Sequence, residues 1–335
     1  MSDHEAVLNV ENLTIYYELE EETVKAVNNV NLKLGKGKTL GLVGETGAGK
    51  TTTALSLLRL IQTPPGVIKS GQITVCGNDI LSLSLKKMEE IRGKDISMIF
   101  QDPMTSLNPV FTVVDQIAES LQMHEKLTKD NAYDKALDML EMVGISRSRG
   151  WEYPHQFSGG MKQRVGIAMA LACNPKLLIA DEPTSALDVT IQAQVLDLMK
   201  ELKDAYQMTM IMITHDLGIV AEICDEVAVM YAGSIVEQGT LDEVFNHTLH
   251  PYTEGLFNSL PNINDRQSEL KPIPGLMPDP TDLPDYCAFA PRCPYVCDAC
   301  MQKPAELTSF GETHKAACIA YESADFHIER GRRNG

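Results

Sequence analysis

The sequence predicts an α/β fold followed by a small cysteine-rich extension. Short apolar runs alternate with amphipathic stretches up to about residue 250, as expected of strands alternating with helices. Two stretches, 175–182 (PKLLIADE) and 208–214 (MTMIMIT), have continuous apolar centres, which is typical of parallel strands buried on both faces. Five of the eight cysteines fall in the last 49 residues, so a compositional boundary lies near residue 250.

The remaining elements follow in chain order. Alternating apolar side chains at 13–17 predict an early strand with one buried face, and the acidic run at 18–22 predicts a solvated hairpin tip. The strand expected at 40–43 runs into a Gly-rich turn, and a helix begins near Lys50. Helical periodicity predicts an amphipathic helix at 161–172. We expect a main domain over 5–250 with a helical subdomain at about 111–157, and the Pro-rich, Cys-rich extension over 251–335.

Length and charge exclude several classes of function. A chain of 335 residues is long enough for two domains, or for one large domain with an appendage. Its 29 basic and 46 acidic residues give a net charge of −17, which argues against nucleic acid as a partner because a phosphate backbone requires a basic face. No run of 18 apolar residues and no secretory signal occurs. We therefore expect a cytoplasmic chain that does not span a bilayer by itself.

Residues 44–51, with the sequence GETGAGKT, fit the P-loop pattern G-x-x-x-x-G-K-[ST] between an apolar strand and a helix. The glycines allow backbone N–H groups to surround phosphates, and the helix N-terminus adds a positive dipole end. Lys50 would then reach the β- and γ-phosphates, and the Thr51 hydroxyl would hold Mg²⁺.

Asp181 and Glu182 end the apolar run LLIADE. Either acid alone is more typical of a helix cap. In a chain that also has a P-loop, the pair favours one carboxylate near Mg²⁺ and one that polarises the attacking water.

Three other features are individually ordinary. Ser158-Gly159-Gly160 is compatible with a helix cap, Gln101 with a loop glutamine, and His215 with a buried core histidine. It is their order and spacing, taken together with the P-loop and the two acidic residues, that indicate a function.

The motifs GETGAGKT, Gln101, FSGGMKQR, LLIADEP, SALD and the pair His215-Asp216 occur in this order over roughly residues 5–250. Together they closely resemble the ATP-binding subunits of ATP-binding cassette (ABC) transporters, with a P-loop ABC ATPase domain. The resemblance implies ATP hydrolysis with Mg²⁺ at an interface between two such domains. The usual signature ends in Gln, whereas Met161 stands there in this chain, a variant that looks like the peptide-importer branch.

The resemblance also implies a role for each motif residue. Glu182, His215 and Gln101 would be catalytic, and Tyr17 would stack on adenine, with Tyr16 as the alternative because the strand register is inferred. The full set is as follows: ATP contacts from Tyr17, Gly44, Glu45, Thr46, Gly47, Ala48, Gly49, Lys50, Thr51 and Thr52; Mg²⁺ contacts from Thr51, Gln101 and Asp181; the signature Ser158, Gly159 and Gly160, which contacts ATP held by the partner; and the D-loop Ser185, Ala186, Leu187 and Asp188.

The stretches FQDPMTSLNP around Gln101 and HPYTEGL at 250–256 are similar to the oligopeptide, dipeptide and nickel permease branch. That branch implies uptake of di- or oligopeptides, with nickel as the alternative cargo. It also implies a second, related ATPase, two transmembrane permease subunits, an extracytoplasmic solute-binding protein acting indirectly, and a place on the cytoplasmic face of the cell membrane. A soluble ABC ATPase of translation or DNA repair is the rival, although such chains usually carry two cassettes or long insertions.

The cysteines of the extension follow the pattern Cys287-x5-Cys293-x6-Cys300-x17-Cys318. In the frame CAFAPRCPY, they resemble the C-terminal extension of the same branch, which favours a 4Fe–4S cluster. Four thiolates would equally hold Zn²⁺, which stays open as the alternative. Cys297 gives a second possible ligand set, and unligated thiols or a redox sensor are further alternatives.

Overall fold

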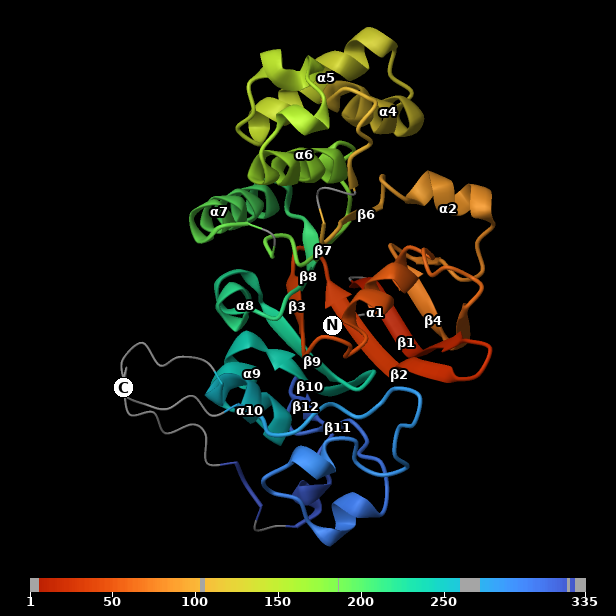
Figure 1. Cartoon of the computed structure of the whole chain (residues 1–335), viewed down its shortest axis with the longest axis vertical. Coiled ribbons are helices and arrows are strands. Elements are labelled where there is room, and N and C mark those ends of the chain that lie inside the picture. Colours follow the sequence, from red (N-terminus) through yellow and green to blue (C-terminus); the bar gives the residue numbers. More distant parts are fainter. Residues whose placement is uncertain (1–5, 103–105, 186, 260–271, 324–325, 329–335) are drawn as a thin grey trace.

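The computed structural model describes residues 6–102, 106–185, 187–259, 272–323 and 326–328. Its two sheets lie side by side, with a helical lobe at one end of the molecule and the cysteine-rich extension at the other (Figure 1). None of the described helices combines the length and apolar character needed to cross a bilayer.

The larger sheet has the strand order β11-β12-β10-β9-β3-β8-β7-β6. Strands β6, β7, β8, β3 and β9 run parallel, whereas β10, β12 and β11 continue the sheet in antiparallel pairs. The strands are β3 (Thr39–Val43), β6 (Ile96–Ile99), β7 (Leu177–Asp181), β8 (Thr209–Ile213), β9 (Glu226–Tyr231), β10 (Ser234–Thr240), β11 (Thr308–Ser309) and β12 (Lys315–Ala316).

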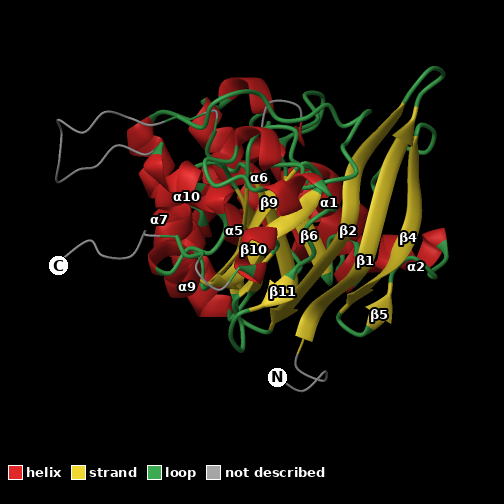
Figure 2. Cartoon of the chain, turned by 90° about the horizontal axis from the view of Figure 1, so that it is seen from below, coloured by secondary structure: helices red, strands yellow, loops and turns green. Residues whose placement is uncertain are grey.

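The smaller sheet is antiparallel, with the order β2-β1-β4-β5. Its strands are β1 (Ala6–Glu18), β2 (Thr23–Gly35), β4 (Gly66–Val75) and β5 (Asn78–Asp79). The three long strands form a layer at one side of the molecule, away from most of the helices (Figure 2). The acidic tip predicted at 18–22 joins β1 to β2.

The helices are α1 (Lys50–Leu57), α2 (Leu85–Ile91), α4 (Val113–Glu125), α5 (Lys129–Met142), α6 (Gly159–Leu171), α7 (Val189–Tyr206), α8 (Leu217–Ile223), α9 (Leu241–Asn246) and α10 (Pro251–Asn258). Short 3₁₀ turns occur at Arg147–Trp151, Pro154–Gln156, Ala290–Arg292, Asp298–Met301 and Ile319–Glu322. The stretch 111–157 is largely helical, and α4, α5 and α6 form the lobe (Figure 1).

The parallel strands are buried on both faces, as their composition predicts. In β7, Leu177 and Ile179 face the core shared with α1 and the antiparallel sheet, whereas Leu178 and Ala180 face the core shared with the helical lobe. All five residues of β7 and of β8 are buried. The strands expected at 40–43, 175–182 and 208–214, and the helix expected near Lys50, are confirmed.

The helix expected at 161–172 exists as α6, but the prediction that it is amphipathic is wrong. No residue from 161 to 172, all of which are described, is fully exposed, and the polar Lys162 and Gln163 are themselves buried. The helix packs against α4, α5, α7 and β6 together. With neighbours on several sides, the helix keeps some partly exposed positions between 161 and 172 but no polar face turned fully to solvent.

Buried Glu237 of β10 ties the extension to the main sheet. Its carboxylate accepts hydrogen bonds from the backbone N–H groups of Leu249 and His250, at 2.8 and 2.9 Å, and lies 2.9 Å from Nε2 of His314. The Glu237 side chain is fully buried. The start of α10 and the β12 region are therefore held by one carboxylate.

We expect Glu237→Ala to lower the free energy of unfolding by about 3 kcal/mol, because three donors, two of them in buried hydrogen bonds, lose their acceptor together. Urea unfolding followed by circular dichroism measures this loss. Glu237→Gln keeps one acceptor oxygen and should lose less. An unchanged urea midpoint for Glu237→Ala would contradict the assigned role.

Candidate nucleotide site

The P-loop connects β3 to α1 in a tight turn that needs glycine at Gly49. This residue has φ +100°, and a Cβ added to it would lie 2.4 Å from the carbonyl oxygen of Ala26. The Lys50 ammonium is buried and donates to the carbonyl oxygens of Gly44 and Glu45, at 2.7 and 2.9 Å. Burial lowers the pKa of Lys50, and the nearby carboxylates of Glu182, Asp181 and Glu45 partly offset that effect. The loop is thus a compact cradle with one cation inside it.

Asp181 ends β7 next to this cradle. Its side chain is 2% exposed and accepts a hydrogen bond from the Thr51 hydroxyl. Among the described residues, its Oδ1 atom is buried with no hydrogen-bond partner. Burial raises the pKa of Asp181. An orphaned carboxylate oxygen beside a hydroxyl fits Mg²⁺, which prefers oxygen ligands.

The three predicted catalytic side chains meet at the next strand ends. Gln101 Nε2 donates to Oε2 of Glu182 at 2.8 Å, and Nδ1 of His215 lies 3.1 Å from Oε1 of the same carboxylate. Glu182 has φ 45°, and its backbone N–H donates to the carbonyl oxygen of Ile213 at 2.8 Å. The carboxylate is therefore held on both oxygens, and a strained backbone at such a position is typical of functional sites.

The two candidate adenine-stacking tyrosines point to different surroundings. The Tyr17 hydroxyl lies 3.4 Å from Oγ1 of Thr52, in the first turn of the helix that follows the P-loop. Tyr16 lines a cavity next to the extension. Tyr17 is thus the tyrosine nearer the P-loop.

The signature residues lie in the helical lobe (Figure 1). Ser158 caps α6, where its side chain accepts from the N–H of Met161, and a Cβ added at Gly160 would meet Ile191 of α7 at 2.5 Å. The Sδ atom of Met161 lies 3.2 Å from Nη1 of Arg149, so the departure from the usual signature is accommodated by packing inside the lobe.

The D-loop residues lead from Glu182 into α7. The Ser185 hydroxyl donates to the carbonyl oxygen of Glu182, Leu187 is partly buried, and Asp188 caps α7. Ala186 lies outside the described residues.

The extension contributes residues that the sequence analysis did not identify. Arg292 donates through Nη1 and Nη2 to the two carboxylate oxygens of Glu45 in the P-loop, each at 3.0 Å. Tyr252 of α10 accepts from the backbone N–H of Glu45 at 2.9 Å. Both residues stand in motifs, CAFAPRCPY and HPYTEGL, that indicated only a branch of the family.

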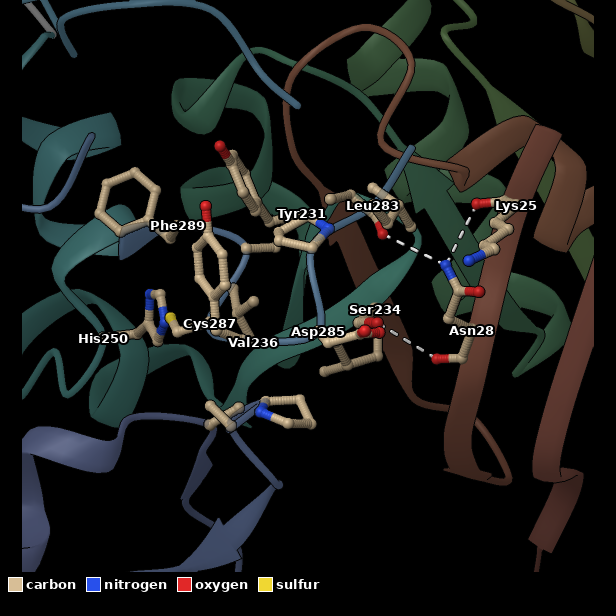
Figure 3. A pocket seen from close by; sticks show the side chains of 18 of the residues that line it. Lys25, Asn28, Tyr231, Ser234, Val236, His250, Leu283, Asp285, Cys287 and Phe289 are labelled. Carbon is tan, nitrogen blue, oxygen red and sulfur yellow. Dashed lines mark hydrogen bonds between the residues drawn. The ribbon is translucent and has the colours of Figure 1, made fainter. Parts of the chain in front are cut away.

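A cavity of about 410 Å³ separates part of the extension from β2 and β10. Figure 3 shows Asn28 and Ser234 on one side of it and the rings of Tyr231, Phe289 and His250 beside Cys287 on another. Burial lowers the pKa of His250 to about 3, so this histidine is neutral, and its Nδ1 accepts from the N–H of Tyr252.

The extension also gathers the predicted cysteine ligands. The pKa of Cys293 is raised to about 12, mainly by burial and to a smaller extent by the neighbouring Cys318, Cys287 and Cys300. Backbone N–H groups face the sulfur atoms of Cys287, Cys293 and Cys318, and Sγ of Cys297 lies 3.3 Å from Sγ of Cys300. In the described parts of the chain, no three His, Cys, Asp or Glu side chains are arranged so that they could hold a metal ion. The thiols are thus neighbours without the geometry of a ligand set.

Comparison with known proteins covers both parts of the chain. The family profile described as ABC transporter matches residues 27–185, and the one described as oligopeptide/dipeptide transporter, C-terminal region, matches residues 236–300. The "Oligopeptide transport ATP-binding protein AppD" of Bacillus subtilis is 48% identical over 94% of this chain and 97% of its own. The "Dipeptide transport ATP-binding protein DppD" of the same organism is 48% identical over 94% of each chain.

Solved structures agree with the sequence relatives. A dimeric, post-hydrolysis ATP-binding cassette, MJ0796 bound to ADP and Pi, superposes with a TM-score of 0.63 at 27% identity, covering 70% of this chain and 98% of that one. The predicted fold class and resemblance are confirmed. On the extent of identity to the transport ATP-binding proteins, this chain belongs to the ATP-binding subunits of ABC transporters, in the oligopeptide/dipeptide transporter family.

Proposed function

We propose that this chain hydrolyses MgATP between two cassettes and thereby drives the uptake of di- or oligopeptides through separate membrane subunits. The observation that carries the proposal is the meeting of Gln101 and His215 on the two oxygens of Glu182, beside Lys50 and Asp181. The names of the relatives, which are oligopeptide and dipeptide transport ATP-binding proteins, support the substrate class.

In this proposal each residue at the strand ends has one task. The P-loop N–H groups and Lys50 bind the phosphates, and Thr51, Gln101 and Asp181 would hold Mg²⁺. Bound there, the ion would neutralise phosphate charge. Glu182 orients or deprotonates the attacking water, because its carboxylate is fixed by two neighbours and needs little reorganisation. His215 keeps Nδ1 on Glu182, and because its side chain is 66% exposed it would present its other ring nitrogen to the γ-phosphate.

The second half of the site comes from another cassette. Ser158, Gly159 and Gly160 lie in the lobe, whereas the P-loop lies against the sheets (Figure 1). We propose that they contact the nucleotide of a second, related ATPase, and that Ser185 to Asp188 touch that partner's site. Hydrolysis removes the contacts that bridge the halves, so opening follows the nucleotide state.

We expect Glu182→Gln to keep ATP binding and to lose turnover, with ATPase below about 10% of wild type in the assembled complex, since a general base is worth well over tenfold. Phosphate release and binding of a fluorescent ATP analogue measure the two properties. Glu90→Gln, at an exposed glutamate of α2, is the matched control. Activity above that level in Glu182→Gln would refute the assignment.

A small groove offers a place for the membrane subunits, on the cytoplasmic face of the membrane. It has a volume of about 190 Å³ between β6, α4 and α6, and it includes Phe100, which is 43% exposed and precedes Gln101. A permease segment seated there would contact the lobe and a neighbour of Glu182 together, which would couple transport to hydrolysis.

A gentle-detergent pull-down from native membranes, analysed by mass spectrometry, tests this arrangement. We expect two multi-span membrane proteins and a second ATPase, and a severalfold smaller yield of the membrane proteins with Phe100→Asp, because a charge would have to be desolvated in the groove. Leu85→Asp, at an exposed position on α2, should not change the yield. Recovery of soluble proteins alone would refute the transport role.

We also propose that Cys287, Cys293, Cys300 and Cys318 hold a 4Fe–4S cluster, with Zn²⁺ as the alternative and Cys297 in an alternative ligand set. The type of donor fits, since four thiols are neighbours and backbone N–H groups face three of the sulfurs, and the sulfur atoms would have to move from their present positions to become ligands. A bound cluster would supply cross-links between the turns of this loop-rich element, and the chain's own contribution is to deliver the thiolates.

The metal content of anaerobically purified full-length chain tests this proposal. We expect iron and acid-labile sulfide, both lost in Cys293→Ser and kept in the control Cys76→Ser, whose cysteine lies outside the extension. Zinc without iron would show that the site holds Zn²⁺ instead of a 4Fe–4S cluster. Loss of iron in Cys297→Ser but not in Cys318→Ser would favour the second ligand set, and no metal at all would overturn the site.

A further inference from the structure

The P-loop is held from outside by the C-terminal extension, through Glu45. Glu45 is the second residue of the loop, and its side chain is 29% exposed. Arg292 binds both of its carboxylate oxygens at 3.0 Å, and Tyr252 accepts from its backbone N–H at 2.9 Å. These segments are separated from Glu45 by more than 200 positions, so no local requirement of the loop brings them there.

The Arg292 guanidinium is committed to this contact. Its side chain is 6% exposed. Its remaining donors reach the carbonyl oxygen of Pro274, at 2.9 Å, and the hydroxyl of Tyr231, at 3.3 Å. A two-pronged pair of this kind fixes orientation as well as charge, which a lysine would not do equally. Burial in such a network makes removal of either partner costly.

The extension is built to present Arg292. This residue ends the short 3₁₀ turn Ala290–Arg292, directly before Cys293. Phe289, which precedes the turn, packs its ring against Tyr231 and Tyr252, with centroids 5.3 and 5.4 Å apart. Figure 3 shows Phe289 beside Tyr231. Because these rings pack together, a shift of the turn would move both Arg292 and Tyr252, the two residues that contact Glu45.

Electrostatics gives the contact a consequence for nucleotide binding. A carboxylate in the second position of a phosphate-binding loop repels a triphosphate, and such repulsion is strong over a few ångströms in a partly buried site. Arg292 neutralises that charge and holds the side chain in the direction of the extension. Without Arg292, Glu45 would retain its charge next to the phosphates.

We propose that Arg292 is a positioning residue for the P-loop, through which the cysteine-rich extension sets the affinity of this cassette for nucleotide. The proposal rests on the proposed function, because it assumes that ATP binds at this loop. The extension is then a regulatory part of the ATPase, since disorder of the turn before Cys293 releases Glu45. Reciprocally, a bound nucleotide stabilises the turn, because coupling between two sites acts equally in both directions.

Titration of the full-length chain with a fluorescent ATP analogue and Mg²⁺ tests the proposal. We expect Arg292→Ala to weaken binding by about tenfold, within the usual range of coupling between sites. Arg292→Lys should have an intermediate affinity, because lysine keeps the positive charge but does not bind both carboxylate oxygens of Glu45 as the guanidinium does. In the assembled complex, Arg292→Ala should raise KM while kcat at saturating ATP stays within about twofold, since the catalytic trio is untouched. The control Lys303→Ala breaks an exposed ion pair within the extension and should bind as wild type does.

A second variant separates this role from general damage to the fold. Glu45→Gln removes the repelling charge, so the double variant with Arg292→Ala should bind nucleotide better than Arg292→Ala alone. In wild type, hydrogen exchange of residues 287–293 should slow when nucleotide is added, and in Arg292→Ala it should not. Wild-type affinity in Arg292→Ala, or a loss that Glu45→Gln does not reduce, would overturn the inference. A wild-type chain that binds no nucleotide would instead overturn the proposed function.

Discussion

The parallel pairing of β6, β7, β8 and β3 is the constraint on which the site depends. Parallel strands end at one edge of a sheet, so the residues that follow them become neighbours whatever their separation in the chain. Gln101 follows β6, Asp181 and Glu182 end and follow β7, His215 follows β8, and the P-loop follows β3. The hydrogen bond from Glu182 N–H to Ile213 extends this pairing by one step beyond the strands.

The excess of negative charge at this edge of the sheet limits how well the site could bind a nucleotide by itself. Asp181, Glu182 and Glu45 all lie close enough to Lys50 to influence its pKa, so three carboxylates surround one ammonium group. A nucleotide would add further negative charge. The guanidinium of Arg292 at Glu45 offsets part of that excess, and Mg²⁺ bound near Asp181, as proposed above, would offset a further part.

Much of this architecture was predictable from the sequence, because the P-loop and the apolar strands are local patterns. The residues at the other strand ends were predictable only from the order of the motifs, since none of them is distinctive alone. The amphipathic character assigned to α6 was wrong because burial on several sides is a tertiary property. The pair between Arg292 and Glu45 was not predicted at all, because no periodicity or spacing relates two residues 247 positions apart.

Among the contacts that join the extension to the cassette, one lies in the main sheet and one lies on the P-loop. Strand β12 adds to the edge of β10, and His314 meets the buried carboxylate of Glu237, so one end is part of the main sheet. The other end carries Arg292 to the P-loop. Because the extension is fixed to the main sheet through β12, it does not simply move together with the P-loop, which it contacts through Arg292. A change inside the cysteine-rich turns would therefore reach the P-loop through Arg292 and Glu45, since Arg292 stands directly before Cys293 and binds the loop.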